Sequence, residues 1–168
     1  LSNDGGKPLE IGDLAVPFPL AERTPARGEI YTKKLIRHSL IAGHGSWIYW
    51  QRAGGDGPYL VMTPTGRTKF EYFDNSAGGA VGIGGFGGAF TPYIHARVAH
   101  AGAIAIGGNW RLPITNLQLA PKGSAGDQIT YSFRFQWARD FAAVRDVLFK
   151  ESKFDTVVVP GMTIPADL

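Results

Sequence analysis

Cysteine is absent from the 168 residues of this chain. Disulfide frameworks, zinc sites with cysteine ligands and thiol catalysis are therefore excluded. Long apolar runs are missing too, since none approaches the roughly 20 residues that a membrane-spanning helix needs. The sequence accordingly predicts no membrane partner.

Charged residues are scarce as well. Charged residues make up 18% of the chain, below the roughly 25% that is usual for soluble domains. The net charge is only +3, and no run of Lys and Arg reaches four residues. This pattern lacks the basic footprint of a nucleic-acid-binding protein. A surface poor in charge is typical of a domain that a neighbour partly covers.

Apolar and turn-forming residues are plentiful. Hydrophobic residues make up 44% and aromatic residues 12%, enough for a sizeable core. The chain has 23 glycines and 11 prolines, which together with the aromatics favours strands joined by turns over a helical bundle. The length fits about one domain.

The residue pattern predicts many short strands and a single helix. Alternation, β-branched content and flanking turns predict strands over Leu9–Val16, one or two within Glu29–Ile41, and then over Ser46–Arg52, Tyr59–Thr63, Thr68–Phe73, Tyr93–Ala99, Thr115–Leu119 and Ile129–Trp137. Tyr59–Thr63 is continuously apolar and predicts a central strand, while the strict alternation of Ile129–Trp137 predicts one buried face. Asp140 is a good N-cap for a helix after it. We therefore expect a mainly all-β fold, an antiparallel β-sandwich with one short helix in the C-terminal region.

Both ends of the chain suggest a larger parent. The residues Asn3-Asp4-Gly5-Gly6 have hairpin-turn chemistry, but only two residues precede them. The last residues, FDTVVVPGMTIPADL, are apolar rather than polar. We expect residues 1–168 to form a single β-sandwich domain, or the later part of one, within a longer chain.

Metal and cofactor motifs are weak. His38 and His44 lie six residues apart, and His95 and His100 lie five apart, so neither pair places two ligands in the neighbouring positions of one strand face. The glycine-rich stretch 75–90 contains GxGxxG, but the residues after it predict a strand rather than the helix that a nucleotide site needs. No pattern pairs two carboxylates, and no GxSxG elbow is present. The sequence predicts no metal and no cofactor.

The aromatic residues are the better candidates for binding. Sugars lay their C–H faces on Trp and Tyr rings. In the strand WIYW, Trp50 points to the face opposite Trp47 and Tyr49, so at least one face belongs to the core. The candidate ligand-binding residues are His44, set between two glycines, Trp50, Trp110, and Arg111, which can bond a sugar hydroxyl or a uronate carboxylate.

Five stretches together carry a resemblance to a known group of proteins. They are NDGGKPLEIGDLA, IYTKKLIRHSLIAGHGSW, PYLVMTP, GGNWRLP and VVPGMTIPADL. The chain resembles a segment of large uncharacterised microbial proteins in which a galactose-mutarotase-like β-supersandwich precedes an (α/α) toroid, as in many glycoside hydrolases and polysaccharide lyases. The resemblance implies a secreted or periplasmic protein, with the toroid of its own parent chain as a partner. It assigns no catalytic residue.

Three functions follow as hypotheses. The first is a β-sandwich module of a carbohydrate-active enzyme that lends loops to a polysaccharide cleft and lacks a complete active site of its own. The second is a stand-alone glycan-binding module, which needs an exposed row of aromatic rings. The third is a structural or interaction sandwich. A mutarotase-type epimerase would need a His and a Glu in one cleft, and no sequence pattern pairs them.

Overall fold

The structure is a computed structural model that describes residues 1–21, 25–77, 89–105 and 112–152. Its strands are β1 (Leu9–Ile11), β2 (Asp13–Ala15), β3 (Leu35–Leu40), β4 (Trp47–Arg52), β5 (Tyr59–Thr65), β6 (Tyr72–Ala77), β7 (Ala89–Ala96), β8 (Leu117–Leu119) and β9 (Ser132–Ala138). Its helices are the short 3-10 turns η1 (Pro19–Ala21) and η2 (Arg27–Glu29), and α1 (Ile30–Lys33), α2 (Arg97–Ala105) and α3 (Phe141–Ser152). No described helix is long and apolar enough to cross a membrane.

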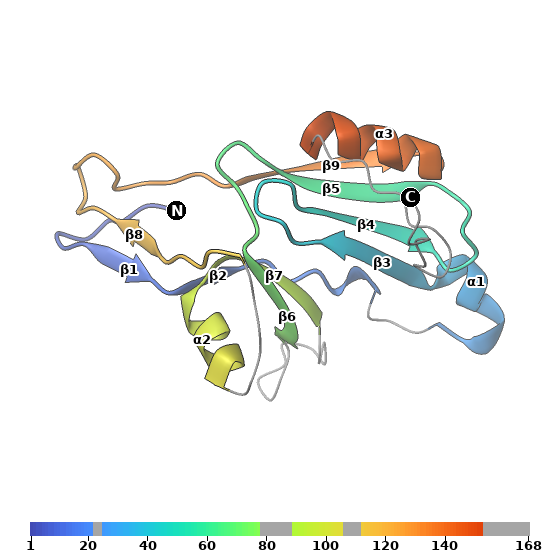
Figure 1. Cartoon of the computed structure of the whole chain (residues 1–168), viewed down its shortest axis with the longest axis horizontal. Helices are drawn as coiled ribbons and strands as arrows, with labels where there is room; N and C mark the ends of the chain where they lie inside the picture. Colours follow the sequence, from blue (N-terminus) through green and yellow to red (C-terminus); the bar gives the residue numbers. More distant parts are fainter. Residues whose placement is uncertain (22–24, 78–88, 106–111, 153–168) are drawn as a thin grey trace, which may run out of the picture.

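The described strands form three antiparallel sheets. The largest has the order β3-β4-β5-β9, the second has the order β2-β7-β6, and β1 pairs with β8. In Figure 1 the four-stranded sheet lies along one half of an elongated molecule, and the β1–β8 ribbon lies at the opposite end. The expected mainly antiparallel, sandwich-like β fold is confirmed.

Two hydrophobic clusters cover the two faces of the four-stranded sheet. One face packs against the second sheet and the segments around it, through Phe18, Ile48, Trp50, Met62, Phe70, Phe90 and Ile94. The other face packs against α3, through Trp47, Tyr49, Tyr59, Val61, Ala138, Val144 and Leu148. The alternation of strand side chains sends Trp50 into one cluster and Trp47 into the other, so both faces of β4 are core.

Several strand predictions hold. β5 lies between β4 and β9, which confirms Tyr59–Thr63 as a central strand.

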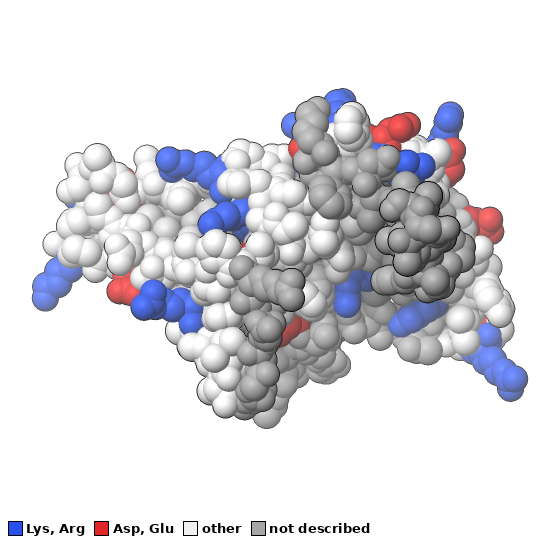
Figure 2. All heavy atoms as spheres, in the orientation of Figure 1, with Lys and Arg blue, Asp and Glu red and all other residues white. Residues whose placement is uncertain are grey.

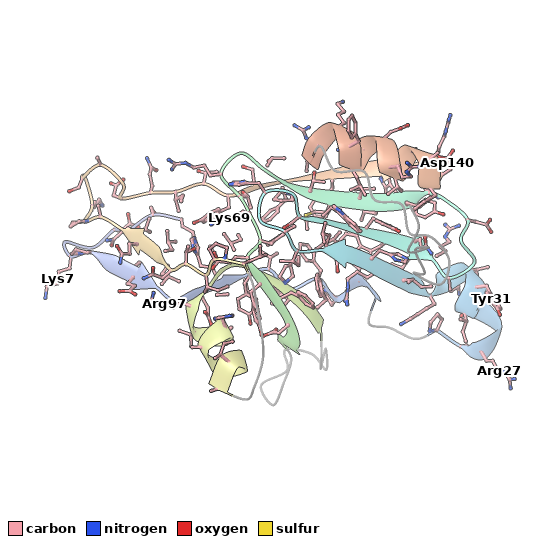
Figure 3. The ribbon with its side chains drawn as sticks, in the orientation of Figure 1. Lys7, Arg27, Tyr31, Lys69, Arg97 and Asp140 are labelled. Carbon is pink, nitrogen blue, oxygen red and sulfur yellow. The ribbon has the colours of Figure 1, made fainter. Side chains whose placement is uncertain are left out.

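The predicted helix cap is also present. The backbone N–H of Ala143 donates to Asp140 Oδ1 at 2.8 Å, which confirms Asp140 as the cap of α3, where Figure 3 labels it. The carboxylate pKa of Asp140 is lowered, first by this bond and further by the Arg139 side chain.

Other predictions at the start of the chain were wrong. Leu9–Val16 is not one strand, because the chain changes sheet at Gly12 between β1 and β2. The partner of β1 comes from β8, more than a hundred residues later, rather than from a preceding strand. Within Glu29–Ile41, by contrast, the one strand β3 agrees with the expected one or two strands, and the residues before it form η2 and α1.

A second substantial helix, α2, was also missed. The predicted strand Tyr93–Ala99 ends at Ala96, and α2 starts at the next residue. Its first turn is capped by Asp13 of β2, whose Oδ1 accepts the backbone N–H of Val98 at 2.8 Å. A helix signal that lies 85 residues away in the sequence cannot be read locally. The glycine-rich stretch from residue 78 and the C-terminal apolar tail lie outside the described residues.

Candidate ligand-binding surface

The clearest departure from the sequence prediction is on β9, where two aromatic rings are exposed. Phe135 is 51% exposed and Trp137 is 70% exposed. They alternate with Arg134 and Gln136, so both rings stand on one face of the strand. The predicted buried aromatic face of Ile129–Trp137 is therefore correct only for its first part, where Tyr131 and Phe133 pack against the core.

The position of β9 in the sheet explains this exposure. β9 is an edge strand, and Trp137 lies opposite the partly buried Leu60 of β5. The ring of Phe18 lies 6.5 Å from the ring of Phe135, edge to face, and is the aromatic neighbour that the core supplies. Beyond it the described residues leave the ring of Trp137 largely uncovered. The second half of β9 thus presents an apolar surface that the described residues leave open.

The opposite face of β9 is fixed to α3. Arg134 Nη1 donates to both carboxylate oxygens of Glu151 at 2.7 Å, and Gln136 Nε2 donates to Glu151 at 3.3 Å. The bond from Arg134 is the main reason that the pKa of Glu151 is lowered. Held by this clamp and by its ladder to β5, β9 presents its two rings on a regular strand rather than on a loop.

A chain of polar side chains lies where the sheets meet. Thr115 Oγ1 donates to Glu71 Oε2 at 2.8 Å and lies 2.7 Å from His95 Nδ1. Because the hydroxyl proton of Thr115 is used on Glu71, His95 Nδ1 is the donor to Thr115. His95 Nε2, 2.6 Å from the Tyr131 hydroxyl, then accepts from Tyr131. Burial lowers the pKa of His95, which favours this neutral ring.

These hydrogen bonds bring Glu71 and His95 together, and an epimerase would require such a pair. Their arrangement, however, is that of groups that stabilise the fold rather than bind a substrate. Glu71 is only 1% exposed, and its Oε1 accepts the backbone N–H groups of Ala96 and Thr115 at 2.9 and 2.8 Å. Lys69 Nζ lies 3.9 Å from the same carboxylate, and Figure 3 shows Lys69 in the middle of the view. A carboxylate whose oxygens are already occupied by the chain has little capacity left for a substrate.

Of the residues predicted from the sequence, the two that the structure describes lie in different environments. His44 is exposed in the turn between β3 and β4. Trp50 is 2% exposed within the first core cluster, so the prediction of a sugar platform on this ring was wrong. Trp110 and Arg111 lie outside the described residues. The binding roles of His44, Trp110 and Arg111 stay predictions.

Charge and metal chemistry give no competing site. Figure 2 shows Lys, Arg, Asp and Glu scattered over the visible face rather than gathered in one patch. Among the described residues no group of three His, Asp or Glu side chains is placed to hold a metal ion. The candidate surface is therefore the aromatic pair Phe135 and Trp137.

Comparison with known proteins gives a family but no activity. Curated proteins and solved structures yielded no match. A family model described as a family of unknown function, DUF5695, matches residues 1–168. Since the match covers the whole chain, this protein belongs to the DUF5695 family.

Proposed function

We propose that this chain is a glycan-binding β-sandwich module of a larger carbohydrate-active protein, with Phe135 and Trp137 as its contact surface. The observation that carries the proposal is the exposure of two aromatic rings on one face of a clamped edge strand. Such a row is what the glycan-binding hypothesis required. A secreted or periplasmic location, which the sequence resemblance implies, would place the surface among polysaccharides.

The physical basis is the amphipathic character of both partners. An exposed ring of Trp or Phe is costly to hydrate and offers a flat π-face, and a pyranose offers a flat array of C–H groups with hydroxyls around its rim. The backbone of Trp137 is held in the β9–β5 ladder, so stacking on its ring orders less of the chain than stacking on a loop residue would. The chain contributes binding in this proposal, and the bond-breaking chemistry belongs to other parts of the parent.

The test is affinity electrophoresis of the whole chain in gels that contain single polysaccharides, both neutral (xylan, mannan, β-glucan) and acidic (pectin, alginate). We expect at least one polymer to retard the wild-type chain, and Trp137→Ala to abolish that retardation. The matched control is Phe149→Ala, which removes a ring that is 56% exposed on α3 rather than on β9. Retardation by none of the polymers, or equal retardation of wild type and Trp137→Ala, would refute the proposal.

A structural or interaction role is the second candidate, and one observation favours it. Within the described residues no strand pairs with the outer edge of β9. An open edge is a template for another strand. This candidate predicts that Trp137→Ala changes the association state of the chain and leaves its migration through every polysaccharide gel unchanged.

A further inference from the structure

Among the described residues, the outer edge of β9 lacks most of the devices that normally protect such a strand, and Arg134 is its one charged residue. Natural edge strands are blunted by Pro, by Lys, by bulges or by a covering segment. The seven residues SFRFQWA contain neither Pro nor Lys, and their ladder to β5 runs from Ala138 to Ser132 without a register shift. Apart from the bond of the Ser132 N–H to Thr68 Oγ1, no described group outside the ladder bonds to the β9 backbone.

We propose that two copies of this chain pair antiparallel through the outer edges of β9, so that Phe135 and Trp137 of both copies form one continuous aromatic row. The pairing itself concerns only the association of two copies of the chain. Its use as a shared glycan platform rests on the proposed function above.

The sequence of β9 suits pairing with itself. In the symmetric register centred on Phe135, Arg134 lies opposite the partner's Gln136, and Phe133 lies opposite the partner's Trp137. No like charges meet, and aromatic residues face aromatic residues, which is a favourable cross-strand arrangement. The carboxylate of Glu151 already contacts both Arg134 and Gln136 of its own chain, so it lies where the cation of the partner arrives.

The two-fold axis decides what the pairing produces. An edge-to-edge antiparallel pair has its axis perpendicular to the sheet, so equivalent faces of both copies lie on the same side. The exposed rings then follow the order Trp137, Phe135, the partner's Phe135, the partner's Trp137. At about 3.4 Å per residue the row spans about 14 Å. Both α3 helices stay on the opposite face and leave the rings open.

The small size of the contact sets the expected strength. Because the rings keep one face open, the backbone edge and the flanks of the two rings bury on the order of 400 Å² on each chain, judged from roughly 150–250 Å² for a fully buried aromatic side chain. A total near 800 Å² is below the roughly 1,200–2,000 Å² of stable complexes. We therefore expect weak, concentration-dependent pairing, strengthened when one polysaccharide spans both copies.

The experiment is sedimentation velocity of the full chain over roughly 10–1,000 µM, the range that a contact of this size requires. The wild type should pass from monomer to dimer. Gln136→Lys should weaken the dimer by about tenfold or more, because two Lys–Arg pairs then oppose each other across the axis. Within one chain the new cation lies beside Glu151, so the fold should keep its thermal midpoint.

The rescue variant is Arg134→Gln combined with Gln136→Lys, which moves the cation by two residues. It removes the like-charge pairs, and dimerisation should return to near the wild-type level. A wild-type chain that stays monomeric throughout the range overturns the pairing, as does a Gln136→Lys dimer equal to wild type. A dimer that binds no polysaccharide would refute the glycan function while leaving the pairing intact, so the two failures are distinguishable.

Discussion

Glu71 and His95 are joined through one hydroxyl: Thr115 Oγ1 donates to the Glu71 carboxylate at 2.8 Å and lies 2.7 Å from His95 Nδ1. Glu71 precedes β6, His95 belongs to β7, and Thr115 precedes β8. The bonds therefore connect segments that are distant in the sequence at the place where the sheets meet. Buried polar bonds of this kind contribute to the uniqueness of a fold as long as every member is satisfied.

Replacement of the buried carboxylate should be costly. Glu71→Gln places an amide group among donors, so at least one of the N–H groups of Ala96 and Thr115 or the Thr115 hydroxyl loses its acceptor. We expect a loss of about 2–3 kcal/mol in the free energy of unfolding, measured by urea denaturation. Lys69→Met removes only the partly exposed partner at 3.9 Å and should cost less than about 1 kcal/mol. Equal costs for the two variants would contradict a structural role for Glu71.

Acidification should weaken the fold through its half-buried imidazoles. Burial lowers the pKa of His95, against an opposing effect of Glu71 and with a further lowering by Lys69, and burial also lowers the pKa of His38. The unfolded chain then binds more protons than the folded chain as pH falls through about 6.5. The stabilisation is fully present above that pH and declines below it.

The measurement is the urea midpoint of unfolding between pH 8 and pH 5. The wild-type midpoint should fall over this interval, and His95→Gln should flatten the slope. His44→Gln is the control, because His44 is exposed in the fold, and the wild-type slope should persist in it. A slope that is the same in wild type and His95→Gln would show that His95 has no part in the pH dependence.

Gly57, in the turn between β4 and β5, is required because the neighbouring backbone leaves no room for a side chain. A Cβ at Gly57 would overlap the backbone carbonyl oxygen of Arg139 and lie 2.9 Å from its carbon. Gly57→Ala should therefore cost more than about 2 kcal/mol, measured by thermal denaturation. At Gly6 a Cβ would meet nothing within 4 Å, so Gly6→Ala should leave the midpoint almost unchanged. A tolerated Gly57→Ala would mean that this turn can move away from Arg139.

Replacing either of two tryptophans in the same sheet should change the free energy of unfolding by very different amounts. Trp50→Ala opens a cavity in the first core cluster and should cost about 3–5 kcal/mol. Trp137→Ala removes a ring that is 70% exposed and should change stability by less than about 0.5 kcal/mol. Chemical denaturation measures both. A large loss in Trp137→Ala would indicate that the ring is covered in solution.

The sequence predicted the elements whose signals are local. Asp140 caps α3 through a hydrogen bond to Ala143, only three residues later in the sequence. The alternation of β4 and the apolar run of β5 are likewise visible within a few residues. The antiparallel, sandwich-like class followed from the same short-range patterns. The strand β9 was also recognised from its alternation, although its aromatic face was assigned to the core.

The tertiary structure decided the features that depend on distant neighbours. Whether an alternating strand lies at the edge or in the centre of a sheet is set by its partners, and the edge position of β9 exposes Trp137 while the inner position of β4 buries Trp50. The cap of α2 comes from Asp13, and the partners of His95 come from Thr115 and Tyr131. The sequence by itself determined which residues alternate and turn. Only the packing of the sheets determined which aromatic residues reach solvent, because burial is a property of the assembled layers and not of any one strand.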